Sequence, residues 1–487
     1  MSGGRPAAGK RPRLLRWLAL PGIAAIAAGL ACIFFLHSQG IAPRILAPYI
    51  AKRSAGHNSL ITGSGKWVAQ TLTSVDRGEP EPYLLPPLML GAQERPAAFD
   101  ISAHARHVAT VEELRAAMAS AQAGEVITLA AGTYKVRRKA LDARNPGSAD
   151  QPIVVRAAQP GTVMLDIDTL EGIVVAGPYW RFENLWLRGV CRRHGACEHA
   201  FHVVGDAHHF VAVNNVLLDF NAHFKINGAR GAFPDHGRIE GNTLRNESVR
   251  KTDNPVTPID LVAASDWVIR GNLIADFVKQ GGDGISYGAF AKGAGARTLF
   301  ERNAVLCEQR LQGERGLRVG LSLGGGGTGK RYCRDGRCIT EQEQGVIRNN
   351  LIAHCSDVGI YINSGARSRI VHNTLLDTAG IDVRFPESSA DIEGNLVDGS
   401  IRSRNGGRVR AEDNLTTPVG FLYFGMHPQR GRFIAPARLD LRWDGKVERR
   451  TASESTPDLC GSVRPARPAY GAFEDFEACG RLAGTGR

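Results

Sequence analysis

Side chains able to carry out acid–base chemistry recur at one position of short alternating segments in the middle of the chain. The second residue of successive segments is Val174, His202, Lys225, Asp260, Ser286, Arg318, Tyr361, Asp382 and Arg402. A guanidinium such as that of Arg318 can neutralise a carboxylate through a bidentate contact. A lysine such as Lys225 can remove a proton if its pKa is depressed, and Tyr361 or His202 can supply one. Together these steps make up β-elimination on a uronic acid.

The fourth residue of the same segments forms a second series, which is small or polar: Ala176, Val204, Asn227, Val262, Gly288, Gly320, Asn363, Arg384 and Arg404. Alternation places the second and fourth residues of a strand on its outer face, with neighbouring coils about 4.8 Å apart. We therefore expect the two series to line a groove in which the glycines leave room for a sugar ring. The candidate substrate-binding residues are His202, Asn227, Asp260, Ser286, Asn363, Asp382 and Arg384.

A purely structural explanation of these series stays open. Outer faces are commonly held by ion pairs between neighbouring coils, such as Lys225 with Asp260. Glycoside hydrolysis, by contrast, needs two carboxylates about 5–10 Å apart. Asp260 and Asp382 are expected four coils apart, about 19 Å. The pattern therefore favours elimination over hydrolysis.

These segments need a regular framework, and a repeated asparagine indicates one. An Asn followed by apolar residues recurs as Asn184, Asn215, Asn242, Asn272, Asn303, Asn350, Asn373, Asn395 and Asn414. Stacked units of short strands and turns, without helical periodicity, are typical of a parallel β-helix. Asn tolerates a left-handed turn and its amide can bond the Asn one coil away, which predicts a ladder. The predicted fold class is all-β, a right-handed single-stranded parallel β-helix.

The limits of the repeat predict the domain boundaries. Residues 111–118 have an amphipathic pattern and are expected to form a short helix that caps the open core. Residues 418–487 lose the repeat and are expected to fold back as a closing tail. The β-helix domain with its cap is therefore placed at 101–417, after a Pro-rich and polar stalk at 38–100.

Positive charge is concentrated at the N-terminus. The formal net charge is +12, and residues 1–53 hold Lys and Arg residues but no acid. The apolar run 17–36 is long enough to cross a hydrocarbon core about 30 Å thick, and longer than the apolar region of a cleaved signal peptide. We predict a basic cytoplasmic tail at 1–16 and a single-pass signal anchor in the inner membrane at 17–37, with a periplasmic C-terminal domain. The exported part is only mildly basic, which argues against nucleic acid as a partner.

Cysteine usage fits export. Cys32 lies in the apolar run, and the remaining cysteines are even in number. The close spacings 191/197 and 333/338 predict local disulfides in an oxidising compartment, and 460/479 is a third pair. This leaves Cys307 to pair with Cys355. The spacings do not match those of zinc sites.

A glycine-rich segment imitates a phosphate-binding loop. Residues 324–330 match GxxxxGK, but Arg331 follows where Ser or Thr would bind Mg²⁺. The segment leads into the Cys333–Cys338 loop rather than a helix. We interpret it as an inserted wall, which also accounts for the long step between Asn303 and Asn350.

Several stretches resemble the chondroitinase B and alginate lyase family of polysaccharide lyases: Gly132-Thr-Tyr-Lys, Gln151-Pro-Ile-Val-Val-Arg-Ala, Pro160-Gly-Thr-Val and Arg181-Phe-Glu-Asn-Leu-Trp-Leu. The resemblance implies a pectate-lyase-like solenoid. It also implies a lysine base and an arginine in the next coil, which correspond to Lys292 and Arg318. Calcium held by an acidic pair is a further implication. The strand before Lys292 reads Ile285-Ser-Tyr-Gly and lacks that pair, so no metal ligand and no firm cofactor is predicted.

The sequence thus predicts a membrane-anchored periplasmic β-helix protein that acts on acidic, uronate-containing polysaccharide, foremost as a lyase. The predicted catalytic residues are Lys292, Arg318, Lys225 and Tyr361. A C5-epimerase begins with the same proton abstraction and is not separated by the sequence. The alternative from another class is a non-catalytic glycan-binding or envelope scaffold protein.

Overall fold

The computed structural model describes residues 14–95, 104–325, 327–451 and 456–480. The chain divides into two compact units, Met1–Asp76 with Pro418–Met426, and Arg77–Thr417 with His427–Arg487. We call the second the β-helix unit. The start of the predicted tail (1–13), the predicted domain boundary (96–103) and the last residues of the predicted closing tail (481–487) lie outside the described residues.

The first unit contains helices α1 (Leu14–Ser38), α2 (Pro43–Ser54), α3 (Ser59–Arg77) and α5 (Val419–Leu422). Arg44 and Asp76 form a buried ion pair at 2.6 Å, which joins α2 to α3. The Tyr423 hydroxyl donates to the carbonyl of Ile41 at 2.8 Å. The region predicted as a stalk is therefore largely helical between residues 43 and 77.

The predicted anchor lies within α1. Among the residues whose side chains are described, which begin at Gly22 in this helix, no single helix meets the length and hydropathy needed to cross a membrane. The bent pair Gly22–Ser38 and Pro43–Ser54, which meet at 109°, meets those requirements together.

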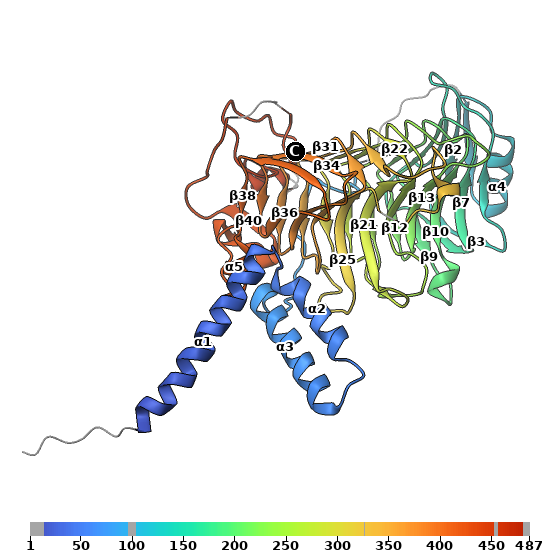
Figure 1. Ribbon diagram of the computed structural model, residues 1–487. Helices are drawn as coiled ribbons and strands as arrows, with labels where there is room; N and C mark the ends of the chain where they lie inside the picture. The colour runs from blue at the N-terminus through green and yellow to red at the C-terminus, as the bar shows by residue number, and fades with distance from the viewer. Residues whose placement is uncertain (1–13, 96–103, 326, 452–455, 481–487) are drawn as a thin grey trace, which may run out of the picture. The chain divides into compact units, whose positions relative to one another are not determined.

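The β-helix unit is a stack of parallel strands, one coil on the next, as Figure 1 shows for strands running from β2 near α4 to β36 and β38. We call its long sheets the site sheet, the second sheet and the third sheet. The site sheet consists of β4 (Leu141–Ala143), β7 (Glu171–Val175), β10 (His199–Val204), β13 (Ala222–Asn227), β17 (Ile259–Val262), β21 (Ile285–Lys292), β25 (Leu317–Leu323), β29 (Ile360–Asn363), β33 (Gly380–Arg384) and β36 (Ser400–Arg404).

The second sheet consists of β1 (His104–Val108), β2 (Glu125–Leu129), β5 (Ile153–Ala157), β8 (Trp180–Glu183), β11 (Val211–Val213), β14 (Arg238–Glu240), β18 (Val268–Arg270), β23 (Leu299–Glu301), β27 (Val346–Arg348), β31 (Ser368–Val371), β34 (Ser389–Glu393) and β37 (Arg408–Glu412). A short sheet of β22 (Gly295–Ala296), β26 (Gln342–Glu343) and β30 (Gly365–Ala366) precedes part of it in the coils. Smaller pairs are β16 (Arg250–Lys251) with β20 (Lys279–Gln280), and β39 (Phe433–Ala435) with β40 (Asp440–Trp443).

The third sheet consists of β3 (Gly132–Arg137), β6 (Val163–Asp168), β9 (Trp186–Gly189), β12 (Val216–Leu218), β15 (Thr243–Arg245), β19 (Leu273–Ala275), β24 (Ala304–Leu306), β28 (Leu351–Ala353), β32 (Thr374–Leu376), β35 (Leu396–Val397) and β38 (Leu415–Thr416). Inward side chains of the long sheets form one continuous apolar core. The stacked parallel sheets confirm the predicted β-helix, whose successive parallel connections are right-handed by general rule.

The predicted cap helix is present as α4 (Val111–Ser120). Thr110 and Glu113 form a capping box at its start, which satisfies backbone donors that the helix leaves unpaired. Leu114, Ala117 and Met118 are buried in the main core. The helix therefore closes the first coils against solvent, as capping elements of repeat proteins do.

The asparagine ladder forms as predicted from Asn215 to Asn414. Each side-chain amide donates to the Oδ1 of the next asparagine at 2.9–3.2 Å. Two details of the prediction are wrong. The left-handed residue is the one before the ladder position, for example Asn214 with φ 57°. Asn184 is such a residue too, and Leu185 occupies the ladder position in that coil.

The outer side of the third sheet is covered in its later coils. Tyr83, Leu88 and Leu90 of the segment after α3 form one buried apolar cluster with Leu306 and Leu351. The C-terminal segment contributes buried side chains to the same cluster, among them Phe433, Leu439, Leu441, Leu459 and Phe473. The C-terminal tail thus packs along the flank of the coil stack.

All of the predicted disulfides are present: Cys191–Cys197, Cys307–Cys355, Cys333–Cys338 and Cys460–Cys479. Cys32 is a free cysteine. Cys307–Cys355 links two successive coils of the stack.

Candidate active site

The outer face of the site sheet has a different register from the predicted one in its central coils. Lys225 pairs with Asp260 as expected, but Asp260 then pairs with Phe290 instead of Ser286. Ser322 rather than Arg318 pairs with Tyr361. The predicted alignment of Ser286 and Arg318 with the series is therefore wrong.

The reason is the length of two strands. β21 and β25 are longer than their neighbours, and their second halves continue the series. Between the halves the alternation slips by one residue: a Cβ on Gly288 would meet core side chains of Val305 and Phe277, yet the next residue, Ala289, is also in the core. Such an irregularity turns every preceding side chain to the other face.

The slip also corrects the predicted role of the glycines. A Cβ on Gly320 would lie 2.6 Å from a methyl group of Ile352 in the core. Gly288 and Gly320 therefore let the site sheet approach the core and do not open room for a sugar ring. The same slip brings Tyr287 to the outer cluster of Val262, Ala263, Phe290 and Phe233.

Most charged groups on the face are paired across coils. The Lys225 ammonium lies 2.9 Å from Asp260, and Asp382 accepts from Arg402 at 3.1 Å and from Arg404 at 2.7 Å. The two ring nitrogens of His202 lie 2.7 Å from Glu171 and 2.9 Å from Asn227. The ion pair predicted by the structural explanation, Lys225 with Asp260, is therefore present.

Lys292 differs from these residues. It pairs in register with Val262, so it belongs to the outward series that contains Asn227, and its ammonium lies 4.2 Å from the centre of the Phe290 ring. With the residues that the structure describes, its side chain makes neither a hydrogen bond nor an ion pair. Burial lowers the pKa of Lys292 most strongly, Lys225 lowers it further, and Asp260 and Glu341 act in the opposite direction.

The inserted loop contributes to the surroundings of Lys292. A Cβ on Gly325 would lie 2.8 Å from the Lys292 Cδ, so the absence of a side chain there lets the loop backbone approach the lysine. At the other end of the loop, Glu341 accepts from the Thr328 hydroxyl at 2.9 Å. The predicted inserted wall therefore lies directly against the candidate base.

Two tyrosines and an arginine form the next part of the face. Arg384 donates to the Tyr361 hydroxyl at 3.3 Å, and the Tyr287 ring meets the Phe290 ring edge-on at 5.6 Å. Burial raises the pKa of the Tyr287 hydroxyl, nearby Tyr361 raises it further, and Arg384 lowers it. The Tyr287 phenol therefore keeps its proton at neutral pH.

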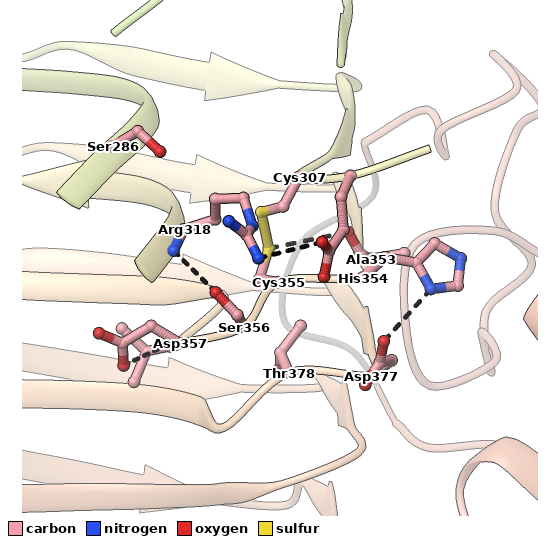
Figure 2. The surroundings of a disulfide bond; sticks show 12 residues. Ser286, Cys307, Arg318, Ala353, His354, Cys355, Ser356, Asp357, Asp377 and Thr378 are labelled. Carbon is pink, nitrogen blue, oxygen red and sulfur yellow. Dashed lines mark hydrogen bonds and ion pairs between the residues drawn. A yellow bond between two sulfur atoms is a disulfide. The ribbon is translucent and has the colours of Figure 1, made fainter. Parts of the chain in front are cut away.

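Arg318 is buried, and Figure 2 shows it beside Ser356 and the Cys307–Cys355 disulfide. Its side chain is 2% exposed and its guanidinium lies 3.0 Å from Glu308, which also pairs with Arg77. Its backbone N–H donates to the Ser356 hydroxyl at 3.0 Å, next to the Cys307–Cys355 disulfide. Arg318 therefore joins coils together. This burial and the pairing with Glu308 do not favour the predicted contact of Arg318 with a substrate carboxylate.

The other predicted residues are mainly buried. Ser286 is 1% exposed, and its hydroxyl donates to the carbonyl of Leu317 at 3.4 Å. Asn363 is 6% exposed, and its Oδ1 has no hydrogen-bond partner in the described part of the chain. Asn363 pairs in register with Arg384, so it lies in the coil next to that arginine.

The residues present do not fit the calcium site implied by the resemblance. Within the described ranges no group of three or more His, Cys, Asp or Glu side chains is arranged to hold a metal ion. Asp260, the carboxylate in the coil before Lys292, is already paired with Lys225. No step below is derived through a metal.

Comparisons with known proteins agree with this architecture. Residues 108–252 match the family model of chondroitinase B, which confirms the resemblance found in the sequence over the first coils and ends before Lys292. A search of curated proteins gives no match.

Among solved structures, pectate lyase Pel9A is similar with a TM-score of 0.51 and 16% identity, covering 74% of this chain and 90% of that chain. An alginate lyase from Paenibacillus sp. str. FPU-7 has 16% identity and a TM-score of 0.34, covering 65% and 96%. A PL6 family polysaccharide lyase from Pseudopedobacter saltans has 12% identity and a TM-score of 0.36, covering 70% and 96%. At these identities, the likeness to the pectate lyase shows the fold alone.

Proposed function

We propose that the chain is a lyase that cleaves an acidic, uronate-containing polysaccharide by β-elimination, with Lys292 as the base. The observation that carries the proposal is the state of Lys292, a half-buried ammonium without an ion-pair partner among the described residues, on a face where other charges are paired. A protein that only needed a stable outer face would gain nothing from such a group.

The proposed reaction uses three groups in turn. Arg384, positioned by its bond to Tyr361, binds the uronate carboxylate and withdraws charge from C5. The neutral Lys292 amine takes the C5 proton, the C–H electrons form the C4–C5 double bond, and the C4–O bond breaks. Tyr287 donates its proton to the leaving oxygen. The products are a sugar chain with a new hydroxyl and one that ends in an unsaturated uronate.

The pKa directions support these roles. A base must be unprotonated, and burial lowers the pKa of Lys292. A proton donor must keep its proton until the bond breaks, and burial raises the pKa of Tyr287. Opposite shifts within one cluster are a common property of acid–base pairs in enzymes.

The deciding experiment assays the full chain in detergent with a panel of uronate polymers. Elimination gives a conjugated product that absorbs in the ultraviolet, whereas hydrolysis does not. Lys292→Met is expected to lower the rate by about 10²–10⁴-fold because it removes the base. Lys330→Met is the matched control, since Lys330 is exposed on the inserted loop. No absorbing product from any polymer, or full activity in Lys292→Met, would refute the proposal.

Two other functions have specific support. The ion pairs of Lys225 and Asp382 favour a non-catalytic glycan-binding or scaffold protein, which would bind the polymer without changing it. A C5-epimerase would use the same proton abstraction by Lys292. Incorporation of deuterium at C5 in heavy water, without an absorbing product, identifies the epimerase. Binding without either change identifies the scaffold.

The location is part of the proposal: α1 anchors the chain in the inner membrane and the β-helix unit lies in the periplasm. The disulfides support an oxidising compartment. Protease added to intact cells should leave the β-helix unit uncut, and protease added to spheroplasts should reach it. Protection in spheroplasts would contradict this location.

A further inference from the structure

A second groove lies on a different sheet from Lys292. Its volume is about 820 Å³, and its lining includes strands β27, β31, β34 and β37 of the second sheet. Five arginines line it, Arg297, Arg367, Arg369, Arg408 and Arg410, and Asp391 is the one acidic residue among its described lining residues. The volume is within the range of about 300–1,000 Å³ typical of ligand sites.

The arginines recur at a regular interval along the stack. Arg297, Gln344, Arg367, Ser389 and Arg408 follow one another in successive coils. Arg369, Asp391 and Arg410 form the neighbouring series. In both series an arginine returns every second coil, about 10 Å apart at the usual strand spacing. A linear polymer lying along the stack would meet them one after another.

Some of these guanidiniums are paired, but they retain donors. Arg297 contacts Asp266 at 2.6 Å, Arg410 contacts Asp391 at 3.0 Å, and Arg367 pairs with Glu343. Arg408 is exposed, and its side chain has neither a hydrogen bond nor an ion pair with the part of the chain that the structure describes. A guanidinium carries five N–H donors, so even a paired one can bind a further anionic oxygen.

We propose that this arginine groove binds a segment of acidic polysaccharide outside the active site and holds the polymer on the enzyme. A pyranose ring extends about as far as one coil, so in a chain with a carboxylate on each sugar the carboxylate of every second sugar falls at the interval of the arginines. The planar fork of arginine suits carboxylates. The concave, arginine-rich floor fits a single polymer better than a flat lipid surface. The polymer class rests on the proposed function.

The test measures binding of fluorescently labelled oligogalacturonate and oligoalginate to the full chain in detergent. Lys292→Met serves as the parent, so that the probes are not consumed. Adding Arg408→Ser with Arg410→Ser is expected to weaken binding at least about tenfold. The matched control is Arg192→Ser with Arg193→Ser, an equal loss of exposed charge in a loop outside the groove, which should change Kd less than about twofold. A neutral glucan oligosaccharide should not bind.

Several results would overturn the groove. These are equal binding by the Arg408/Arg410 variant and the parent, equal loss in the Arg192/Arg193 control, or no binding of either acidic probe. Loss of binding to phosphatidylglycerol vesicles with unchanged binding of both sugars would identify a lipid surface instead. Failure of the lyase proposal gives a different result. In that case no polymer yields an ultraviolet-absorbing product, but the Arg408/Arg410 variant still binds the acidic probes more weakly than its parent.

Discussion

Two cations on the neighbouring strands β21 and β25 lie in opposite environments, one inside the stack and one on its outer face. Arg318, in the first half of β25, is buried against Glu308, whereas Lys292, at the end of β21, lies on the outer face without an ion-pair partner among the described residues. Burial lowers the pKa of both groups. The two residues differ in whether a carboxylate lies at ion-pair distance. Glu308 keeps Arg318 charged and structural, whereas Lys292 has no such partner in the described part of the chain and can exchange its proton.

The largest expected effect is the loss of stability when Arg318 is replaced. Arg318→Met leaves Glu308 buried with one cation fewer, and loss of one member of a buried pair typically costs about 3–5 kcal/mol of unfolding free energy. Urea unfolding of the full chain in detergent measures this loss. Removing the carboxylate as well, with Glu308→Leu, should recover part of it. A loss below about 1 kcal/mol for the single variant would mean that the pair does not hold the coils together.

The next effect tests the proton donor beside Lys292. Tyr287→Phe keeps the ring against Phe290 but removes the hydroxyl, so turnover should fall about a hundredfold with little change in thermal stability. Initial rates of product absorbance measure this change. Tyr332→Phe is the control, because Tyr332 is 58% exposed on the inserted loop. Equal rates for wild type and Tyr287→Phe would assign proton donation to another group, with Tyr361 the next to test.

A smaller effect concerns stability at the Lys292 end. Lys292→Met removes a half-buried charge that has no ion-pair partner among the described residues, and it should raise the unfolding free energy at neutral pH by about 1 kcal/mol. The pKa of Lys292 is lower in the folded state, so at pH values between that lowered pKa and about 10.4 the unfolded chain binds more protons than the folded chain. The stability of the wild type therefore increases with pH over this range, and the stability difference between the variant and the wild type becomes smaller. Thermal unfolding of the wild type and of Lys292→Met at several pH values measures the gain in stability and its dependence on pH. A Lys292→Met variant less stable than the wild type would indicate a structural role for Lys292.

The smallest effect is a shift in pH dependence. Glu341 raises the pKa of Lys292, so Glu341→Gln should lower it and move the acidic limb of the rate profile to lower pH, by less than about one unit. Glu112→Gln, at an exposed position of α4, should leave the profile in place. An unchanged limb in Glu341→Gln would show that the limb reports a group other than Lys292.

The fold could be predicted from the sequence because each coil repeats the same turn. The ladder amide and the left-handed residue before it recur with each turn, so Asn215 to Asn414 mark the stack. The disulfides were accessible on other grounds: three pairs from their sequence spacing, and Cys307–Cys355 by elimination. Asn184 was misplaced because two adjacent positions of the turn both accept Asn.

The site was only partly accessible, because alternation alone cannot locate a slip within a long strand. Ile285–Gly288 and Ala289–Lys292 both read as strand segments, and only pairing with β17 shows which one continues the series. The spacing to the ladder does not settle it either: Val204 precedes Asn215 by eleven residues, but Val262 precedes Asn272 by ten. Nothing in the sequence marked Tyr287 as outward or Glu308 as the partner of Arg318.

The Cys307–Cys355 link has a consequence for how the protein survives damage. It closes a covalent ring that contains the whole inserted loop, including the exposed Arg331. A protease that cuts once after Arg331 severs the backbone without releasing either part, and coils on both sides stay tethered across the cut. Such a nicked chain runs as one species in a gel without reductant and as two fragments with it. The wall beside Lys292 can thus be opened by proteolysis while the stack that carries the site stays in one piece.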